Sequence, residues 1–162
     1  MGSDHEACEI YHLENIQASE RMAKCLSGIL RAGDTLALCG DLGAGKTSLT
    51  GLILGNWGIT DVTSPTFTLL HSYISMFMVH HLDFYRIESA DELYHLGWDD
   101  LQDGKSLVIV EWMDRFPEIY PDNYLQIFMA YTGEGRDAYV CAGGARGREM
   151  LRELKRCGIT GN

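Results

Sequence analysis

The stretch GDLGAGKT, residues 40–47, places three glycines directly before a lysine and a threonine. It fits the pattern GxxxxGK[ST], and its flanks fit as well: the short apolar run Thr35–Cys39 predicts a buried strand before it, and a helix is expected from about Lys46 to Gly55 after it. Glycines let successive backbone N–H groups converge on phosphate oxygens, where larger side chains would block the approach. The stretch therefore predicts a loop that binds the phosphates of a nucleotide.

Individual residues of this loop have separate expected tasks. The helix beginning at Lys46 presents the positive end of its dipole to the phosphates, and the Lys46 side chain reaches the β and γ phosphates. The Thr47 hydroxyl is a candidate ligand for Mg²⁺. The residues expected to contact the nucleotide here are Asp41, Leu42, Gly43, Ala44, Gly45, Lys46, Thr47 and Ser48.

Two acidic residues are candidates for handling the metal ion and the attacking water. The stretches 77–83 and 106–112 are predicted strands, which carry Asp83 and Glu111 at their carboxyl ends. Mg²⁺ requires a hard carboxylate ligand, direct or through water, at such a position. Glu111 follows a wholly apolar run, so we expect it to face the ligand crevice and to orient or deprotonate a water. The alternative for either acid is a surface carboxylate or a salt-bridge partner.

Apolar spacing along the rest of the chain predicts alternating strands and helices with a late antiparallel hairpin. We therefore expect an α/β fold of the P-loop NTPase type, with three layers and a mixed parallel and antiparallel sheet flanked by helices. The further expected elements are a helix over 18–30, an ordered loop running into a strand over 60–73, a helix over 90–101, and a hairpin formed by 124–130 and 138–142.

No repeat, low-complexity tract or linker divides the sequence, so one domain is expected over residues 1–162, with its core at about 17–141. A basic tail over 145–157 has apolar residues at helical spacing and is expected to be a helix. Its charges form either a solvated helix face or a contact with a partner or RNA. The basic residues of this cluster are Arg146, Arg148, Arg152, Lys155 and Arg156.

The net charge of −10 argues against a protein that holds nucleic acid unaided, because such proteins usually present a basic surface to phosphates. No DNA partner is expected. The longest apolar runs, such as LVIV at 107–110, are far shorter than the roughly 18 to 20 residues of a membrane span. The first ten residues lack the apolar core of a signal peptide. A cytoplasmic protein without membrane contact is the expectation.

Cysteine and histidine positions are also informative. Five cysteines, at 8, 25, 39, 141 and 157, are widely scattered and contain no CxxC pair. They predict a reducing compartment, with neither a zinc site nor disulfides. The six histidines, including the adjacent His80 and His81, lack the spacing of metal ligands, and we expect ordinary strand or surface residues there.

Several motifs occur together in an order that is distinctive. After the glycine loop come SPTFTLL, HHLDFYRIES, HLGWDD and VIVEWMDRFP, and the last motif is GRD. In this order and at these distances they resemble the TsaE (formerly YjeE) family of small P-loop ATPases. The resemblance covers roughly residues 17–140. The first fifteen or so residues and the tail after Cys141 contain no distinctive feature of that family.

This resemblance implies a place in the bacterial pathway that installs N6-threonylcarbamoyladenosine at position 37 of tRNAs reading ANN codons. Family members hydrolyse ATP to ADP with Mg²⁺ while bound to the partner proteins TsaB and TsaD, of which TsaD transfers the carbamoyl group. Hydrolysis is expected to serve turnover of that assembly. Such a role agrees with the acidic charge balance, since the partners would hold the tRNA.

The family resemblance also assigns roles to residues of this chain. Lys46 and Thr47 match the phosphate and magnesium residues, and Thr66 matches a switch-like threonine that senses the γ-phosphate or its metal. Asp83 matches the metal-associated aspartate of HxDxYR. In the EW pair, Glu111 matches the water-activating acid, and its neighbour at 112, Trp112, is expected near the nucleotide. Catalysis is thus expected to involve Glu111, Lys46 and Thr66, and the metal to involve Thr47, Asp83 and Glu111.

Alternatives remain open at this point. The chain has no NKxD or TKxD element that reads guanine, which favours adenine as the base. A small-molecule P-loop kinase would need a lid bearing arginines, and only Arg86 and Arg115 lie between 83 and 117. A nucleotide-gated binding module with little hydrolysis is another possibility. We expect slow turnover by the isolated chain, because no strong candidate for a catalytic arginine is evident near the loop.

Overall fold

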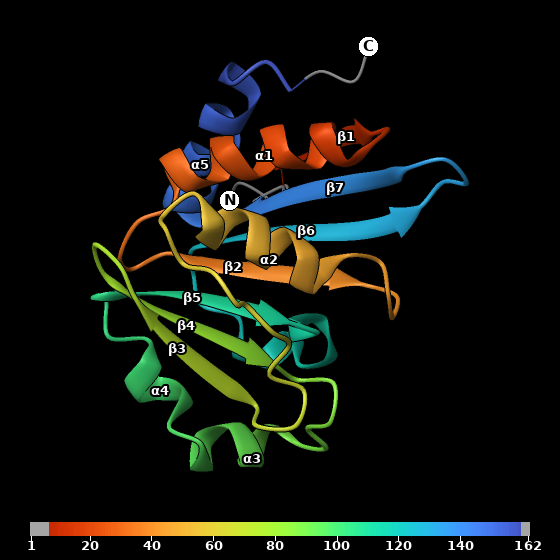
Figure 1. The fold of residues 1–162 in the computed structure, drawn as a ribbon. Coiled ribbons are helices and arrows are strands. Elements are labelled where there is room, and N and C mark those ends of the chain that lie inside the picture. The colour runs from red at the N-terminus through yellow and green to blue at the C-terminus, as the bar shows by residue number, and fades with distance from the viewer. Residues whose placement is uncertain (1–6, 160–162) are drawn as a thin grey trace, which may run out of the picture.

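Residues 7–159, which the computed structural model describes, form one seven-stranded sheet in the order β1-β7-β6-β2-β5-β4-β3 (Figure 1). The strands are β1 (Ala7–Leu13), β2 (Thr35–Gly40), β3 (Leu70–Ile74), β4 (Met78–Asp83), β5 (Ser106–Glu111), β6 (Tyr124–Tyr131) and β7 (Arg136–Gly143). The helices are α1 (Ile16–Ile29), α2 (Lys46–Gly55), α3 (Ala90–His95), α4 (Trp98–Leu101) and α5 (Gly144–Arg156), with 3₁₀ turns at Met113–Arg115 and Pro117–Ile119.

Parallel pairing at the centre of the sheet decides where the strand ends lie. β6, β2, β5 and β4 are parallel neighbours, whereas β1, β7 and β3 are attached antiparallel at the two sides. The carboxyl ends of the four central strands therefore meet at one edge of the sheet. β7 runs opposite to β6, so its first residue, Arg136, lies at the same edge and pairs with Tyr131.

The two faces of the sheet carry separate apolar cores. In β2, Leu36 and Leu38 face one core, and Ala37 and Cys39 face the other, as the period of two in a strand requires. Helices α1, α2 and α5 cover the first face, and α3, α4 and the 3₁₀ turns contribute to the second core (Figure 1). Burial on both faces explains why the central strands are almost wholly apolar in sequence.

The predicted helix over 90–101 is wrong in one respect, because the structure divides it into α3 and α4. Gly97, between them, has a φ of 86°, a left-handed conformation that glycine adopts at low cost. The predictions of α2, of the strands at 35–39, 77–83 and 106–112, and of the late hairpin are confirmed to within two residues at each end.

Strand β1 and helix α5 extend the structure beyond the predicted core of 17–141. Leu13 of β1 and Met150 of α5 are buried in the first core, at 2% and 0% exposure. A helix was expected in the basic tail, and α5 confirms it, whereas β1 was not predicted. Over most of its length, exposed residues alternate with half-buried ones. The sequence of β1 therefore lacks the continuous apolar run that predicted the central strands.

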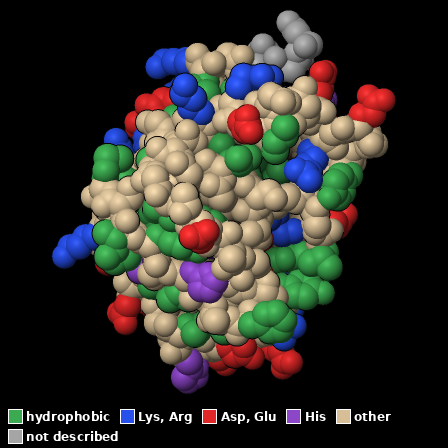
Figure 2. Space-filling view, viewed as in Figure 1, with side chains coloured by type: hydrophobic (Ala, Val, Ile, Leu, Met, Phe, Trp, Pro, Cys, Tyr) green, Lys and Arg blue, Asp and Glu red, His purple; other side chains and the backbone are tan. Residues whose placement is uncertain are grey.

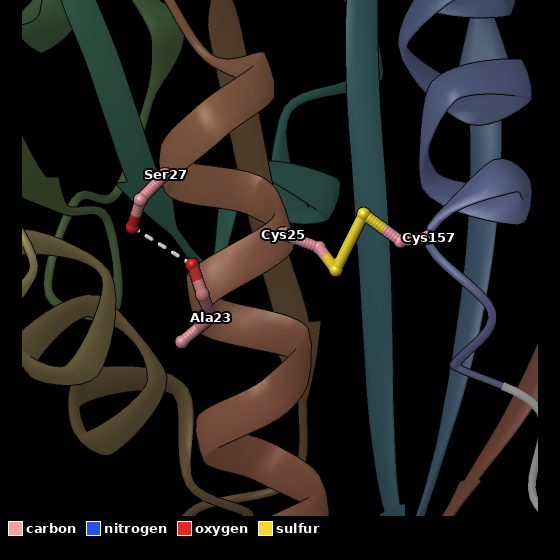
Figure 3. The surroundings of a disulfide bond; sticks show 4 residues. All are labelled: Ala23, Cys25, Ser27 and Cys157. Carbon is pink, nitrogen blue, oxygen red and sulfur yellow. Dashed lines mark hydrogen bonds between the residues drawn. A yellow bond between two sulfur atoms is a disulfide. The ribbon is translucent and has the colours of Figure 1, made fainter.

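Two disulfides contradict the prediction that the cysteines are unpaired. Cys8 of β1 is bonded to Cys141 of β7, and Cys25 of α1 is bonded to Cys157 just after α5 (Figure 3). The paired positions are 133 and 132 residues apart, so their spacing in the sequence gave no sign of the pairing. The fold brings them together because β1 pairs with β7 and α5 packs against α1. The cysteines therefore no longer support a reducing compartment.

Removing the Cys25–Cys157 disulfide is expected to lower stability, because the bond adds a second cross-link to an unfolded chain that Cys8–Cys141 already closes. Cys25→Ser should lower the free energy of unfolding by about 2–4 kcal/mol in urea titrations under oxidising conditions. Within residues 7–159 the fifth cysteine, Cys39, is free. A thiol reagent should therefore detect one reactive thiol in wild-type protein that is denatured without reductant.

The control uses the same proteins in reductant. There Cys25→Ser and wild type should unfold at nearly the same urea concentration, since both then lack the bond, and Cys157→Ser should behave as Cys25→Ser does. Five reactive thiols in oxidised wild type would contradict both disulfides.

The basic cluster of α5 is partly engaged within the protein. Arg146 donates from Nε and Nη2 to the two carboxylate oxygens of Asp34, at 2.9 and 2.8 Å, and from Nη2 to the Ile29 carbonyl at 2.8 Å. The hydrogen bonds to Asp34 raise the pKa of the guanidinium, against the effect of burial. Lys155 pairs with Glu9 of β1 at 2.9 Å. These charges hold α5 to the rest of the fold and are not free for a partner.

Mixed charge characterises the surface near α5. Figure 2 shows Lys and Arg side chains at the upper end of the molecule with Asp and Glu side chains among them. Among the described residues, no helix combines the length and the apolar character that crossing a bilayer requires.

Arg146→Ala is expected to destabilise the fold by about 3 kcal/mol, because it leaves the buried Asp34 carboxylate without its bidentate partner. Urea titration would measure the change. Arg152→Ala is the matched control on the same helix: Arg152 is exposed, and the expected change is within about 0.5 kcal/mol. Equal effects of the two substitutions would show that the ion pair contributes nothing.

Candidate functional site

A cavity of about 340 Å³ lies at the sheet edge where β2, β4 and β5 end. Its walls come from the glycine loop, from the loop before β3 and from the segments that follow β4 and β5. The predicted site residues that line it are Leu42, Gly43, Gly45, Lys46, Thr47, Ser48, Thr66, Asp83, Glu111 and Trp112.

The other two predicted residues, Asp41 and Ala44, lie elsewhere. Ala44 is fully buried in the first core, and its N–H donates to the Asp41 carbonyl at 3.0 Å. The Asp41 side chain is exposed, and the same carbonyl accepts a bond from Lys46. Both residues thus shape the loop through the backbone.

Two glycines of the loop occupy positions where a side chain would not fit. Gly40 has a φ of 127°, and a Cβ there would collide with the Met129 carbonyl of β6. Gly45 has a φ of 105°, and a Cβ there would lie 2.8 Å from Nη1 of Arg136. Close approach of the backbone requires glycine at Gly40, and the left-handed conformation favours glycine at both positions.

Lys46 is folded back under the loop. Its ammonium donates to the carbonyls of Gly40 and Asp41, each at 2.8 Å, and lies 4.2 Å from the centre of the Trp112 ring. Burial lowers the pKa of Lys46, while the carboxylates of Glu111 and Asp83 act in the opposite direction. Two of the three ammonium protons are used in these bonds, and Lys46 lines the cavity.

Glu111 joins the loop to the sheet. Its carboxylate accepts a bond from the Thr47 hydroxyl, which lies 2.9 Å from both carboxylate oxygens. His81 of β4 lies 2.7 Å from the same carboxylate and is fully buried. We did not predict a site role for His81. The HxD spacing contained the signal, because residues two apart in a strand share a face and Asp83 was a candidate.

Asp83 holds the loop before β3. Its Oδ2 atom accepts bonds from the hydroxyls of Thr66 at 2.9 Å and Ser64 at 3.2 Å, and its Oδ1 accepts from the N–H of Tyr85 at 2.9 Å. Thr66, the expected switch residue, is thus in contact with an expected metal residue at the cavity wall.

An arginine does lie beside the glycine loop, so the expectation that none is near is wrong. Arg136, the first residue of β7, lines the cavity, and its guanidinium lies 5.3 Å from the centre of the Tyr131 ring. The Tyr131 hydroxyl donates to the carbonyl of Gly43. Arg136 is the arginine of the GRD motif, but it follows the loop by 90 positions, and only the β6–β7 hairpin brings it there.

A second cavity of about 320 Å³ adjoins the first, and Arg136 and Tyr131 help to form it. Its other walls are the end of β1, the start of α1 and the turn between β6 and β7. Arg136 belongs to the walls of both cavities, so this residue can contact a ligand in either.

The donor groups at the first cavity suit Mg²⁺. The hydroxyl of Thr47 and the carboxylates of Glu111 and Asp83 are hard oxygen ligands, and all three line the same space. Mg²⁺ prefers oxygen ligands and is usually held by one or two carboxylates together with phosphates and water. The residues present therefore fit this ion.

Comparison with known proteins gives a consistent result. The family "Threonylcarbamoyl adenosine biosynthesis protein TsaE" matches residues 13–138. The chain belongs to the TsaE family. Its relatives include the TsaE protein of tRNA threonylcarbamoyladenosine biosynthesis from Bacillus subtilis, 37% identical over 88% of this chain and 90% of that protein, and the one from Nostoc sp., 36% identical over 68% and 70%.

A solved structure confirms the fold class. The crystal structure of YdiB from Bacillus subtilis superposes with a TM-score of 0.76 and 29% sequence identity, covering 95% of this chain and 98% of that one. The fold is therefore of the P-loop NTPase type, with the mixed sheet and flanking helices that the sequence predicts. The match to the TsaE family ends before α5 but includes every candidate site residue, Arg136 among them.

Asp83→Ala is expected to release the loop before β3, because it removes the acceptor that Ser64 and Thr66 share. Amide hydrogen exchange of residues 63–68 should become at least about tenfold faster while the core strands keep their protection. Ser64→Ala removes the longer of the two bonds and the contact of Ser64 with Thr66 but keeps the bond from Thr66 to Asp83, so it should have a smaller effect. Unchanged exchange in Asp83→Ala would show that other contacts hold the loop.

Proposed function

We propose that this chain is a Mg²⁺-dependent ATPase that acts with the partner proteins TsaB and TsaD in forming N6-threonylcarbamoyladenosine at position 37 of tRNA. One observation carries the proposal: a lysine, a hydroxyl and two carboxylates from separate elements converge on one cavity beside a glycine loop. Membership in the TsaE family supplies the pathway.

Binding of the phosphates falls to the loop and to two cations. Residues at the start of α2, Lys46 among them, line the cavity where a triphosphate would lie, and a helix N-terminus attracts such an anion. Arg136 lines the same cavity beside Gly45 and adds a positive charge. The cavity shared by Arg136 and Tyr131 has room for the nucleoside, so we assign it to adenosine.

Hydrolysis requires a metal ion and an oriented water. Thr47, Asp83 and Glu111 would hold Mg²⁺, directly or through water, and the ion would neutralise charge on the phosphates. Glu111 accepts hydrogen bonds, and its ionised carboxylate is suited to orient or deprotonate an attacking water. Trp112 packs against the Lys46 ammonium and helps to keep it beside the loop.

Nucleotide state would be communicated through Thr66. Its hydroxyl is bonded to Asp83, so a metal ion that recruits Asp83 would also change the loop before β3. That loop carries Phe67, which is 81% exposed, and a partner could detect its position. The acidic chain itself would contact tRNA only through the assembly.

The deciding experiment compares wild type, Glu111→Ala and Lys46→Ala with TsaB and TsaD present. Glu111→Ala should bind ATP with Mg²⁺ but lose at least about 100-fold in kcat, because its water is no longer oriented. Lys46→Ala should lose ATP binding as well. Calorimetry and phosphate release would measure the two effects.

Other outcomes distinguish the alternatives. Transfer of the γ-phosphate to an acceptor other than water would favour a small-molecule kinase. ATP binding by wild type without turnover, in the presence of both partners, would favour a nucleotide-gated binding module. Full activity of Glu111→Ala would contradict the role of that residue.

A further inference from the structure

We propose that His81 is a positioning residue for Glu111: its imidazole Nε2–H donates to Glu111 Oε2 and thereby leaves Oε1 as the oxygen available to water or metal. The inference rests on the proposed ATPase function. It concerns a residue that touches only the catalytic carboxylate and acts through it.

The register of β4 against β5 brings the side chains of His81 and Glu111 together. β4 and β5 are parallel neighbours, with His81 opposite Ile109 and Asp83 opposite Glu111. His81 and Asp83 are two apart in β4, so they share the sheet face on which Glu111 also lies. The two atoms His81 Nε2 and Glu111 Oε2 are 2.7 Å apart, and the residues are 0% and 3% exposed. Water therefore competes little for this bond.

Proton placement follows from the partners of the ring. An ionised carboxylate only accepts hydrogen bonds, so Nε2 must carry the proton that joins it to Glu111. The other ring nitrogen, Nδ1, is buried and has no hydrogen-bond partner among residues 7–159. A proton on Nδ1 would be a buried donor without an acceptor, which is costly. The Nε2–H tautomer satisfies both conditions.

The bond to His81 distinguishes the two oxygens of Glu111, which the bond to Thr47 does not. Thr47 Oγ1 is 2.9 Å from Oε1 and 2.9 Å from Oε2, so its one proton leaves rotation of the carboxylate undetermined. His81 contacts Oε2 alone. Oε2 thus lies within reach of two donors and Oε1 of one, so Oε1 retains the greater capacity to accept a bond from water or to ligate a cation.

The test uses three substitutions of His81 that differ in whether their side chain can place a donor at the position of Nε2. The amide nitrogen of Gln can occupy the place of Nε2, whereas that of Asn reaches only the place of Nδ1, and Leu fills the volume without a donor. With TsaB and TsaD present, His81→Gln should keep kcat within about threefold of wild type, and His81→Asn and His81→Leu should lower it about tenfold or more. The KM for ATP should change little, because His81 touches no expected phosphate ligand.

His80→Gln is the matched control. His80 is the adjacent residue, on the other face of β4, and its Nδ1 is bonded to Ser72 at the surface. It should retain wild-type kcat. Melting temperatures of all variants separate loss of fold from loss of function, and the comparison of Gln with Asn remains decisive if His81→Leu does not fold.

Nitrogen-15 NMR of the imidazole tests the bond without turnover. The Nε2–H tautomer of His81 is expected in wild type, and the Nδ1–H tautomer would overturn the inference. Equal kcat for His81→Gln and His81→Asn would overturn it too, while leaving the ATPase function intact. Absence of hydrolysis by wild type with both partners would instead contradict the proposed function, and the inference with it.

Discussion

Parallel pairing of β4, β5, β2 and β6 brings the glycine loop and the two acidic residues of the site to one edge of the sheet. In a parallel sheet the carboxyl ends of adjacent strands lie at one edge, so a loop after one strand meets the terminal residues of the next. Asp83 and Glu111 are direct partners in the register of β4 and β5, and the glycine loop follows β2 at their side. Antiparallel addition of β7 then places Arg136 at the same edge.

At this edge of the sheet, the polar groups of the site are mostly hydrogen-bonded to one another. Lys46 donates to backbone carbonyls of its own loop, Thr47 to Glu111, and Thr66 to Asp83. The bonds of Thr47 and Thr66 each join an element that would contact a nucleotide to one that would hold the metal ion. A ligand that recruits either carboxylate must therefore rearrange hydrogen bonds on both sides of the cavity, which gives a physical basis for communication between nucleotide and loop.

Local patterns were sufficient for the central part of the fold. Glycine spacing and the apolar run before it located β2, the loop and α2, and acidic residues at two strand ends located Asp83 and Glu111. Long-range features left no such pattern. Arg136 reaches the loop through a hairpin, and the cysteine pairs depend on how β1 and α5 dock. His81 and His80 are adjacent, and the alternation of side chains along β4 turns His81 toward Glu111 and His80 toward Ser72; the sequence did not show that β5, which carries Glu111, lies beside β4.

The two disulfides change the topology of the chain when its native contacts are lost. Each bond joins positions more than 130 residues apart and the two bonds overlap along the chain, so the oxidised polypeptide unfolds to two fused rings and not to a linear thread. Strands β1 and β7 are then still neighbours, as are α1 and the end of α5. The contacts of greatest separation along the sequence are thus formed without the entropy cost of bringing distant segments together.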